Sequence, residues 1–225
     1  MVHVVLFDID GTLIQTGGAG VRAFAETARA EFGLPDGTAG LQFAGRTDTS
    51  IVREFFRRHG LPETPANFHR FFDSYVFWLD HLLPRLEGGI LPGVWSWLHG
   101  LRALRTPPLV ALLTGNIRLG AELKLRHFRL WEEFALGAFG DDSEDRNELA
   151  AIARDRGAAA LGRRLAGEEI LVIGDTPLDI RCARAIGARV LAVGTGRDPV
   201  AELRAHGPDY AVGSLRELSP AEVCG

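Results

Sequence analysis

The sequence predicts an α/β fold: a doubly wound, Rossmann-like parallel sheet into which an all-helical cap is inserted. From residue 90 onward, short apolar runs typical of buried strands alternate with amphipathic segments typical of helices. Such alternation favours a parallel sheet with helices on both faces. Between the first apolar run and residue 89, the hydrophobic spacing is helical throughout. We therefore predict an α/β core of residues 1–15 and 90–225 and a cap of residues 16–89.

The first strand is predicted at residues 2–7, and three amphipathic helices follow it in the cap. The second spans about residues 48–59, and the third has Thr64 as its N-cap with Pro65 in its first turn. The first helix ends at Gly33 and has an apolar stripe. That stripe comprises Val21, Phe24, Ala25, Ala28 and Phe32. Glycines at 17, 18, 20, 88 and 89 flank the cap, as a two-stranded hinge between domains requires.

Four more strands are predicted after the cap, each next to a helix. The predicted strand ends are Thr114, Gly140, Asp175 and Val193, and the predicted helix starts are Gly93, Ile117, Ser143 and Pro177. Ligands of a doubly wound sheet bind at the carboxyl ends of its strands. This rule gathers residues that are distant in sequence into one crevice. They are Asp8, Asp10, Thr114, Arg146 and Asp175.

Composition is typical of a globular protein, with 46% hydrophobic and 24% charged residues and a formal net charge of -4. This balance gives no basic excess that would attract nucleic acid or acidic lipid. No apolar run is long enough to span a membrane, and no signal peptide is recognisable. With only Cys182 and Cys224, a disulfide framework or zinc site is not expected, which favours the cytoplasm. The oligomeric state is left open.

Asp8 and Asp10 directly follow the first strand, and Asp175 follows a strand that can lie beside it. Two carboxylates ~4 Å apart repel by roughly 4 kcal/mol at an effective dielectric constant of ~20. A shared proton or a hard divalent cation would relieve this repulsion. Mg²⁺ prefers a few carboxylates together with water and phosphate oxygens, and this cluster could supply the carboxylates. The metal would also offset the repulsion between a carboxylate nucleophile and an anionic phosphate.

Phosphate oxygens can be held by Thr114, Gly115 and Asn116, which precede a predicted helix. Arg146 opens a later helix and places a positive charge near the end of the third strand. Lys124 is a poorer candidate, since it lies ten residues past Thr114, roughly 15 Å further along a helix.

Four segments, in this order, resemble the motifs of the haloacid dehalogenase-like hydrolase superfamily. "DIDGT" at residues 8–12 is similar to the first motif and Thr114 to the second. Arg146 stands where the third has lysine or arginine, and "GDTPLD" at residues 174–179 is similar to the fourth. The resemblance covers the whole chain, including a helical cap of the family's first class. This sequence differs from the family's motifs at two places. The second motif is "LLTGN", and the third lacks the Lys-Pro pair that is common in relatives.

The resemblance implies a magnesium-dependent phosphomonoesterase that acts on a small metabolite through an aspartyl-phosphate. It makes Asp8 the nucleophile and Asp10 the general acid and base. It has Thr114 and Arg146 bind the phosphoryl group. It has Asp8, the Asp10 carbonyl and Asp175 hold Mg²⁺, with Asp179 in support.

Other functions remain open at this point. Relatives that dehalogenate lack an acid two residues after the nucleophile, so Asp10 argues against that reaction. A sugar phosphomutase is the first alternative, and a non-catalytic binding protein on the same fold is another. Residues 17–23, "GGAGVRA", match a dinucleotide-binding pattern, but the strand ends ten residues earlier. In the cap, Arg46 lies in a predicted loop and is the candidate for substrate recognition.

Overall fold

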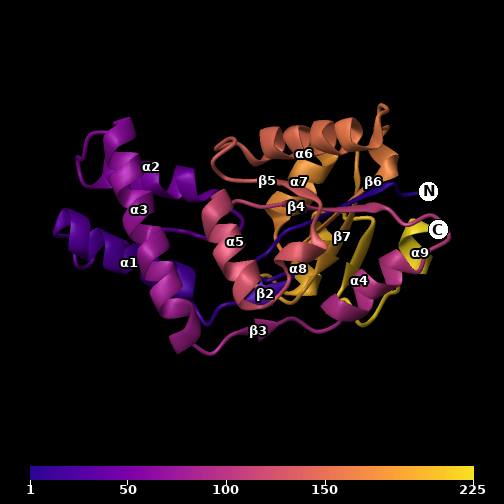
Figure 1. Ribbon diagram of the computed structural model, residues 1–225, viewed down its shortest axis with the longest axis horizontal. Coiled ribbons are helices and arrows are strands. Elements are labelled where there is room, and N and C mark those ends of the chain that lie inside the picture. Colours follow the sequence, from indigo (N-terminus) through magenta and orange to yellow (C-terminus); the bar gives the residue numbers. More distant parts are fainter.

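The computed structural model describes residues 1–225 and contains a six-stranded sheet in which every neighbouring pair is parallel. The strand order is β5-β4-β1-β6-β7-β8. The strands are β1 (Val4–Phe7), β4 (Leu109–Leu113), β5 (Leu136–Ala138), β6 (Ile170–Gly174), β7 (Arg189–Val193) and β8 (Tyr210–Val212). Helices cover both faces of this sheet, so the predicted α/β class is confirmed (Figure 1).

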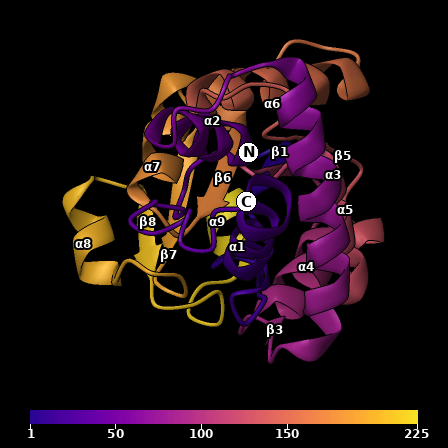
Figure 2. The ribbon, with the colours of Figure 1, turned by 90° about the vertical axis from the view of Figure 1, so that its left-hand side faces the viewer.

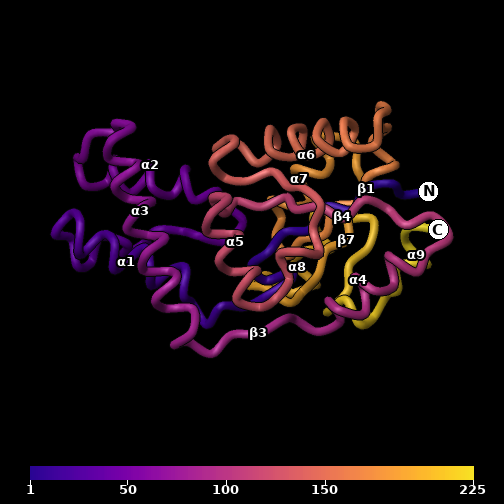
Figure 3. The backbone as a smooth tube through the Cα atoms, in the orientation of Figure 1, coloured from indigo at the N-terminus to yellow at the C-terminus, as the bar shows by residue number.

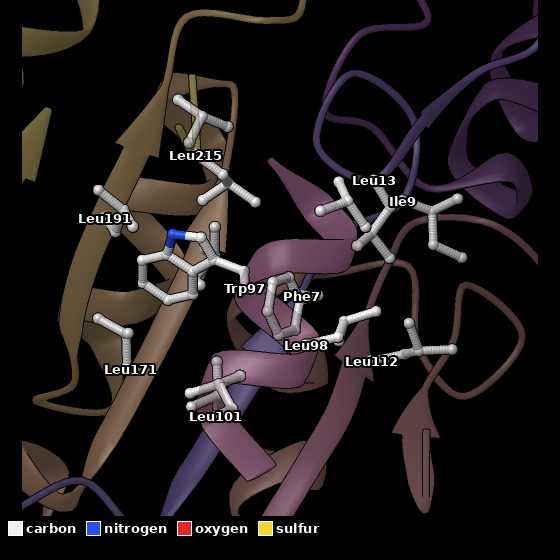
Figure 4. Close-up of a cluster of buried hydrophobic side chains, with 14 of the residues drawn as sticks. Phe7, Ile9, Leu13, Trp97, Leu98, Leu101, Leu112, Leu171, Leu191 and Leu215 are labelled. Atoms are coloured by element: carbon white, nitrogen blue, oxygen red, sulfur yellow. The ribbon is translucent and has the colours of Figure 1, made fainter. Parts of the chain in front are cut away.

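The side chains of β1 alternate between two hydrophobic clusters, one on each face of the sheet. Val5 and Phe7 belong to one cluster, and Val4 and Leu6 to the other. The first cluster involves α4 (Val94–Arg102), α5 (Arg118–His127) and α9 (Pro220–Cys224), and the second involves α6 (Arg146–Leu161), α7 (Pro177–Ala185) and α8 (Val200–Ala205). Figure 4 shows Phe7 and Trp97 among the leucines of the first cluster. Burial on both faces explains why β1 is an unbroken apolar run.

Three helices form a body of their own beyond the carboxyl ends of the strands (Figures 1 and 2). They are α1 (Ala19–Phe32), α2 (Asp48–Arg58) and α3 (Pro65–Leu82). Their shared core includes five buried aromatic side chains: Phe24, Phe55, Phe56, Phe71 and Tyr75. Short 3-10 helices occur at Leu83–Arg85, Trp131–Glu133 and Gly167–Glu169.

Two chain segments link the helical body to the sheet (Figure 3). They include β2 (Ile14–Gln15) and β3 (Gly89–Ile90), which pair antiparallel at the predicted domain boundaries. Gly17 follows with a φ of 60°, and a Cβ there would clash with the carbonyl of Glu87. Glycine is therefore needed where the two links pass each other.

The structure departs from the sequence prediction at the sheet edge and in helix α1, among other places. The sixth strand, β8, was not predicted, because three half-buried residues at a sheet edge give too short a pattern. Val21 was expected on the buried stripe of α1, but it is 47% exposed and lines a cavity between the helical body and the sheet. Phe24 and Ala28 of the predicted stripe are buried, and the other buried residues of α1 are Ala19, Ala23 and Thr27.

No helix of the structure combines the length and the apolar character needed to cross a lipid bilayer.

Candidate active site

Three buried carboxylates meet at the carboxyl end of the sheet. Phe7 of β1 pairs with Ile173 of β6, so Asp8 and Asp175 leave neighbouring strand ends. Asp179 joins them from the first turn of α7, and ligand atoms of the three all lie within 4.8 Å of one another. Their close approach in a buried site requires compensating positive charge.

Arg146 supplies part of that charge. It is buried, its Nη2 lies 3.1 Å from Asp8 Oδ1, and the same nitrogen pairs with Asp179. The arginine is fixed at the first position of α6 because Asp145 caps this helix, accepting a hydrogen bond from the Asn147 N–H at 2.7 Å. The structure thus brings Arg146 to the candidate nucleophile from a separate helix.

The oxygens of Asp179 and Asp175 differ in how many partners they have. Both oxygens of Asp179 are occupied, one by Arg146 and the other by the Thr176 N–H at 3.0 Å and hydroxyl at 2.7 Å. Asp175 Oδ1 accepts from the Thr12 hydroxyl at 3.0 Å, and its Oδ2 accepts no hydrogen bond within the chain. Asp179 is therefore placed to support the cluster, and Asp175 retains an oxygen for a ligand.

The pKa values of Asp8 and Asp175 are raised, and the main cause for both is burial. Burial raises the pKa of Asp8 to about 6, although Arg146 opposes the shift. Burial, followed by the negative charge of Asp8, raises the pKa of Asp175 well above its usual value. Both shifts report carboxylates that lack sufficient positive charge. Oxygen donors of this kind fit a hard divalent cation such as Mg²⁺.

Thr114, Gly115 and Asn116 lie between β4 and α5. Since β4 and β6 flank β1, this segment and Asp175 follow strands on opposite sides of β1. The Asn116 amide donates to Thr114 Oγ1 at 2.8 Å and to Asp10 Oδ2 at 2.9 Å. Gly115 touches the helical body, because a Cβ there would clash with the carbonyl of Arg46. The predicted phosphate loop is thus joined to Asp10 by hydrogen bonds.

Lys124 also reaches this site, although the sequence analysis placed it too far along its helix. Its Nζ lies 2.6 Å from Asp10 Oδ2 and 2.6 Å from Asn116 Oδ1, and the residue is buried. The distance argument was wrong for two reasons. Helix α5 begins only at Arg118, and helical side chains point back toward the N-terminal end of their helix. Lys124 is the only lysine in the chain, a signal that was available.

Asp48 was not predicted and docks the helical body onto the sheet. Its Oδ2 accepts the Ile117 N–H at 2.9 Å, and its own N–H donates to the Gly115 carbonyl at 2.7 Å. Burial raises the pKa of Asp48 to about 6, with Lys124 opposing the shift. Hydroxyls on either side of it extend the contact: Thr47 donates to the Glu144 carbonyl and Thr49 to the Gly140 carbonyl. The segment around Asp48 therefore fixes the position of the cap over the Thr114–Asn116 segment.

One cavity of about 440 Å³ lies between the helical body and the sheet. Asp179 does not line it, whereas most of the other site residues do: Asp8, Asp10, Asp48, Thr114, Gly115, Asn116, Lys124, Arg146 and Asp175. Arg46 lines it as well, but its guanidinium binds Glu54, the Ser50 carbonyl and the Gln42 carbonyl within the helical body. The predicted substrate contact of Arg46 thus stays a prediction. Arg197, in the loop after β7, lines the cavity and has no carboxylate partner; it donates to Gln42 Oε1 at 3.1 Å.

Fold and site together define a hydrolase with a Rossmann-like α/β core, a helical cap and clustered aspartates at the carboxyl ends of central strands. The chain belongs to the haloacid dehalogenase-like hydrolase family, whose model matches residues 5–184. The resemblance inferred from the motifs, and with it the class of enzyme, is confirmed.

Relatives and solved structures agree with this membership. The chain is 29% identical to a phosphoglycolate phosphatase of Chromobacterium violaceum, over 96% of this chain and 95% of the relative. It is 26% identical to a probable phosphatase, IndB, of Dickeya dadantii, over 97% of this chain and 92% of the relative. The crystal structure of CbbY from Rhodobacter sphaeroides with phosphate shares the fold, with a TM-score of 0.75 at 20% identity over 99% of both chains.

Proposed function

We propose that the protein is a magnesium-dependent phosphomonoesterase that acts on a small phosphorylated metabolite through an aspartyl-phosphate at Asp8. The observation that carries the proposal is the pairing of the buried Asp8 carboxylate with Arg146 at 3.1 Å, beside Asp175 at the next strand end. The relatives that match this chain over more than nine-tenths of their own length are named as phosphatases, which supports the same reaction class.

Different side chains of the site carry out the successive steps of the hydrolysis. Asp8 attacks phosphorus, the bond from phosphorus to the ester oxygen breaks, and Asp10 gives its proton to the departing oxygen. Asp10 then takes a proton from the water that attacks the phosphorus of the aspartyl-phosphate. This releases inorganic phosphate and restores the Asp8 carboxylate. Arg146 and the Thr114–Asn116 segment hold the phosphoryl oxygens in place.

A magnesium ion would be held by Asp8, the Asp10 carbonyl and Asp175. When bound, it supplies positive charge that offsets the repulsion between the attacking carboxylate and the phosphate. Asp179 has both oxygens occupied, so its part is to orient Arg146 and cap α7.

The direct test is the release of phosphate from 4-nitrophenyl phosphate and from a panel of phosphate esters. We expect release that stops when divalent metal is removed by chelation and returns when Mg²⁺ is added. A sugar phosphomutase would instead convert one sugar phosphate into another without net release. Full activity after exhaustive chelation would contradict the magnesium requirement, and no release from any ester would contradict the phosphatase assignment.

Arg46 is expected to act on the part of the substrate beyond the phosphate. Arg46→Ala should lower kcat/KM for the best natural ester by roughly tenfold, the scale of a lost charge-assisted hydrogen bond. Hydrolysis of 4-nitrophenyl phosphate should be nearly spared. Glu54→Gln is the matched control, since it weakens the same ion pair but keeps the cation. Equal losses in both variants and on both substrates would assign Arg46 to the folding of the cap.

A further inference from the structure

The side chain of Asn116 connects the proposed phosphate-binding segment to the proposed acid and base. Its amide donates to Thr114 Oγ1 at 2.8 Å and to Asp10 Oδ2 at 2.9 Å. Thr114 Oγ1 also accepts the Asn116 N–H at 3.3 Å, and the proton of this hydroxyl is donated to no group of the chain. A hydroxyl in this state can donate to a phosphoryl oxygen. The position of Asn116 therefore affects both the Thr114 hydroxyl and the orientation of Asp10.

The backbone on both sides of Asn116 is held from the cap by one residue, Asp48. The peptide that precedes Asn116 is held through the Gly115 carbonyl, which accepts the Asp48 N–H at 2.7 Å. The peptide that follows is held through the Ile117 N–H, which donates to Asp48 Oδ2 at 2.9 Å. The carbonyl of this second peptide accepts the Gly140 N–H at 2.7 Å. Because a trans peptide is planar, hydrogen bonds at both of its ends fix the orientation of the whole unit.

The cap is tied to the core by other bonds that do not involve the Asp48 side chain. Arg53, further along α2, forms a bidentate ion pair with Glu144 of the core, with Nε at 2.9 Å and Nη2 at 2.6 Å from Oε1. The Asp48 side chain makes one hydrogen bond, the one that it accepts from the Ile117 N–H. Its carboxylate thus acts on the backbone next to Asn116, whereas Arg53 acts on the docking of the cap.

A carboxylate at this position is unfavourable for binding an anion unless it has another role. Asp48 is 8% exposed and lines the cavity that Thr114 and Asp10 also line. Its negative charge repels an anionic phosphate, and its burial removes favourable hydration. The hydrogen bond to the Ile117 N–H offers a compensating role, because without it a buried backbone donor would lack an acceptor.

We propose that Asp48 is a positioning residue of the phosphatase, whose carboxylate holds the backbone of Asn116 so that Thr114 and Asp10 are presented to the substrate. The inference rests on the proposed function and extends it, since a residue of the cap then completes the phosphoryl-binding segment of the core. Asp48 itself need not touch the substrate. Its effect passes through the Asn116–Ile117 peptide and the Asn116 amide.

Two substitutions at Asp48 separate the hydrogen bond from the charge. Asp48→Ala removes the acceptor and should lower kcat for 4-nitrophenyl phosphate by roughly tenfold to a hundredfold, because the active-site groups are misplaced. It should also weaken the binding of inorganic phosphate, measured by calorimetry with Mg²⁺ present, by about tenfold. Asp48→Asn keeps an acceptor oxygen and removes the charge. It should recover most of the lost kcat and bind phosphate at least as tightly as the wild-type protein.

Arg53→Gln is the matched control on the same helix. It removes the ion pair with Glu144 but no contact of the Thr114–Asn116 segment, so the dissociation constant of phosphate should not change. Melting temperatures identify variants that fail to fold, and if Asp48→Ala is among them, the comparison of Asp48→Asn with the wild-type protein decides.

Three results would overturn the role of Asp48. They are unchanged phosphate binding in Asp48→Ala, weaker phosphate binding in Asp48→Asn than in the wild-type protein, and equal losses in Asp48→Ala and Arg53→Gln. A wild-type protein that releases phosphate from no ester would overturn the proposed function instead. The two failures can be distinguished because the phosphate affinities are measured without turnover.

Discussion

Asp8→Asn is expected to abolish the hydrolysis of phosphate esters while leaving the protein folded. An amide cannot form the phosphoryl bond on which the two-step reaction depends, and loss of a nucleophile of this kind lowers kcat by roughly 10⁴-fold or more. The measurement is steady-state release of phosphate from 4-nitrophenyl phosphate at saturating Mg²⁺.

A loss of activity in Asp8→Asn can be distinguished from a loss of folding, because the substitution relieves the repulsion between the carboxylates of Asp8 and Asp175. Burial raises the pKa of the Asp8 carboxyl to about 6, and an amide removes that buried charge next to Asp175. The melting temperature of Asp8→Asn should therefore not fall markedly. Asp80→Asn, at an exposed carboxylate of α3, is the matched control and should be fully active. Substantial turnover by Asp8→Asn would show that another group attacks phosphorus.

Asp10→Asn is expected to slow turnover by about a hundredfold to ten-thousandfold, the usual effect of removing a positioned acid and base. Asp10 is half-exposed toward the cavity, and its Oδ2 is oriented by Lys124 at 2.6 Å and Asn116 at 2.9 Å. An asparagine can keep most of this contact geometry but cannot exchange a proton. Substrate binding should therefore change little, and the loss should be in kcat.

The identity of the leaving group sharpens this test. An alkyl phosphate needs its departing oxygen protonated, whereas 4-nitrophenolate leaves readily without a proton. The transfer of phosphate to Asp8 should thus be slowed more for ethyl phosphate than for 4-nitrophenyl phosphate, as measured by single-turnover kinetics. An Asp10→Asn enzyme within about threefold of wild type would mean that the roughly hundredfold or larger acid–base contribution comes from another group.

Local patterns in the sequence determined the fold class and the position of the main acidic cluster. The run at β1 is apolar throughout because both faces of the sheet are buried, and this property is visible without knowing its neighbours. Asp8 and Asp175 could be brought together because parallel strands end at one edge of a sheet. Their juxtaposition follows from topology rather than from side-chain detail.

Thr114, Asn116 and Arg146 were also predicted for the site and line the cavity. The tertiary structure alone decided which further side chains reach it. Lys124 was discounted by counting residues, yet its side chain extends back along α5 to Asp10. Tyr75 is buried in the aromatic core of the cap, and it also lines the cavity. Asp48 gave no signal at all, since its role depends on how the cap docks on the sheet. Hydrophobic periodicity reports which face of a helix is buried, but the cavity lies between two bodies whose relative placement is set by contacts distant in sequence.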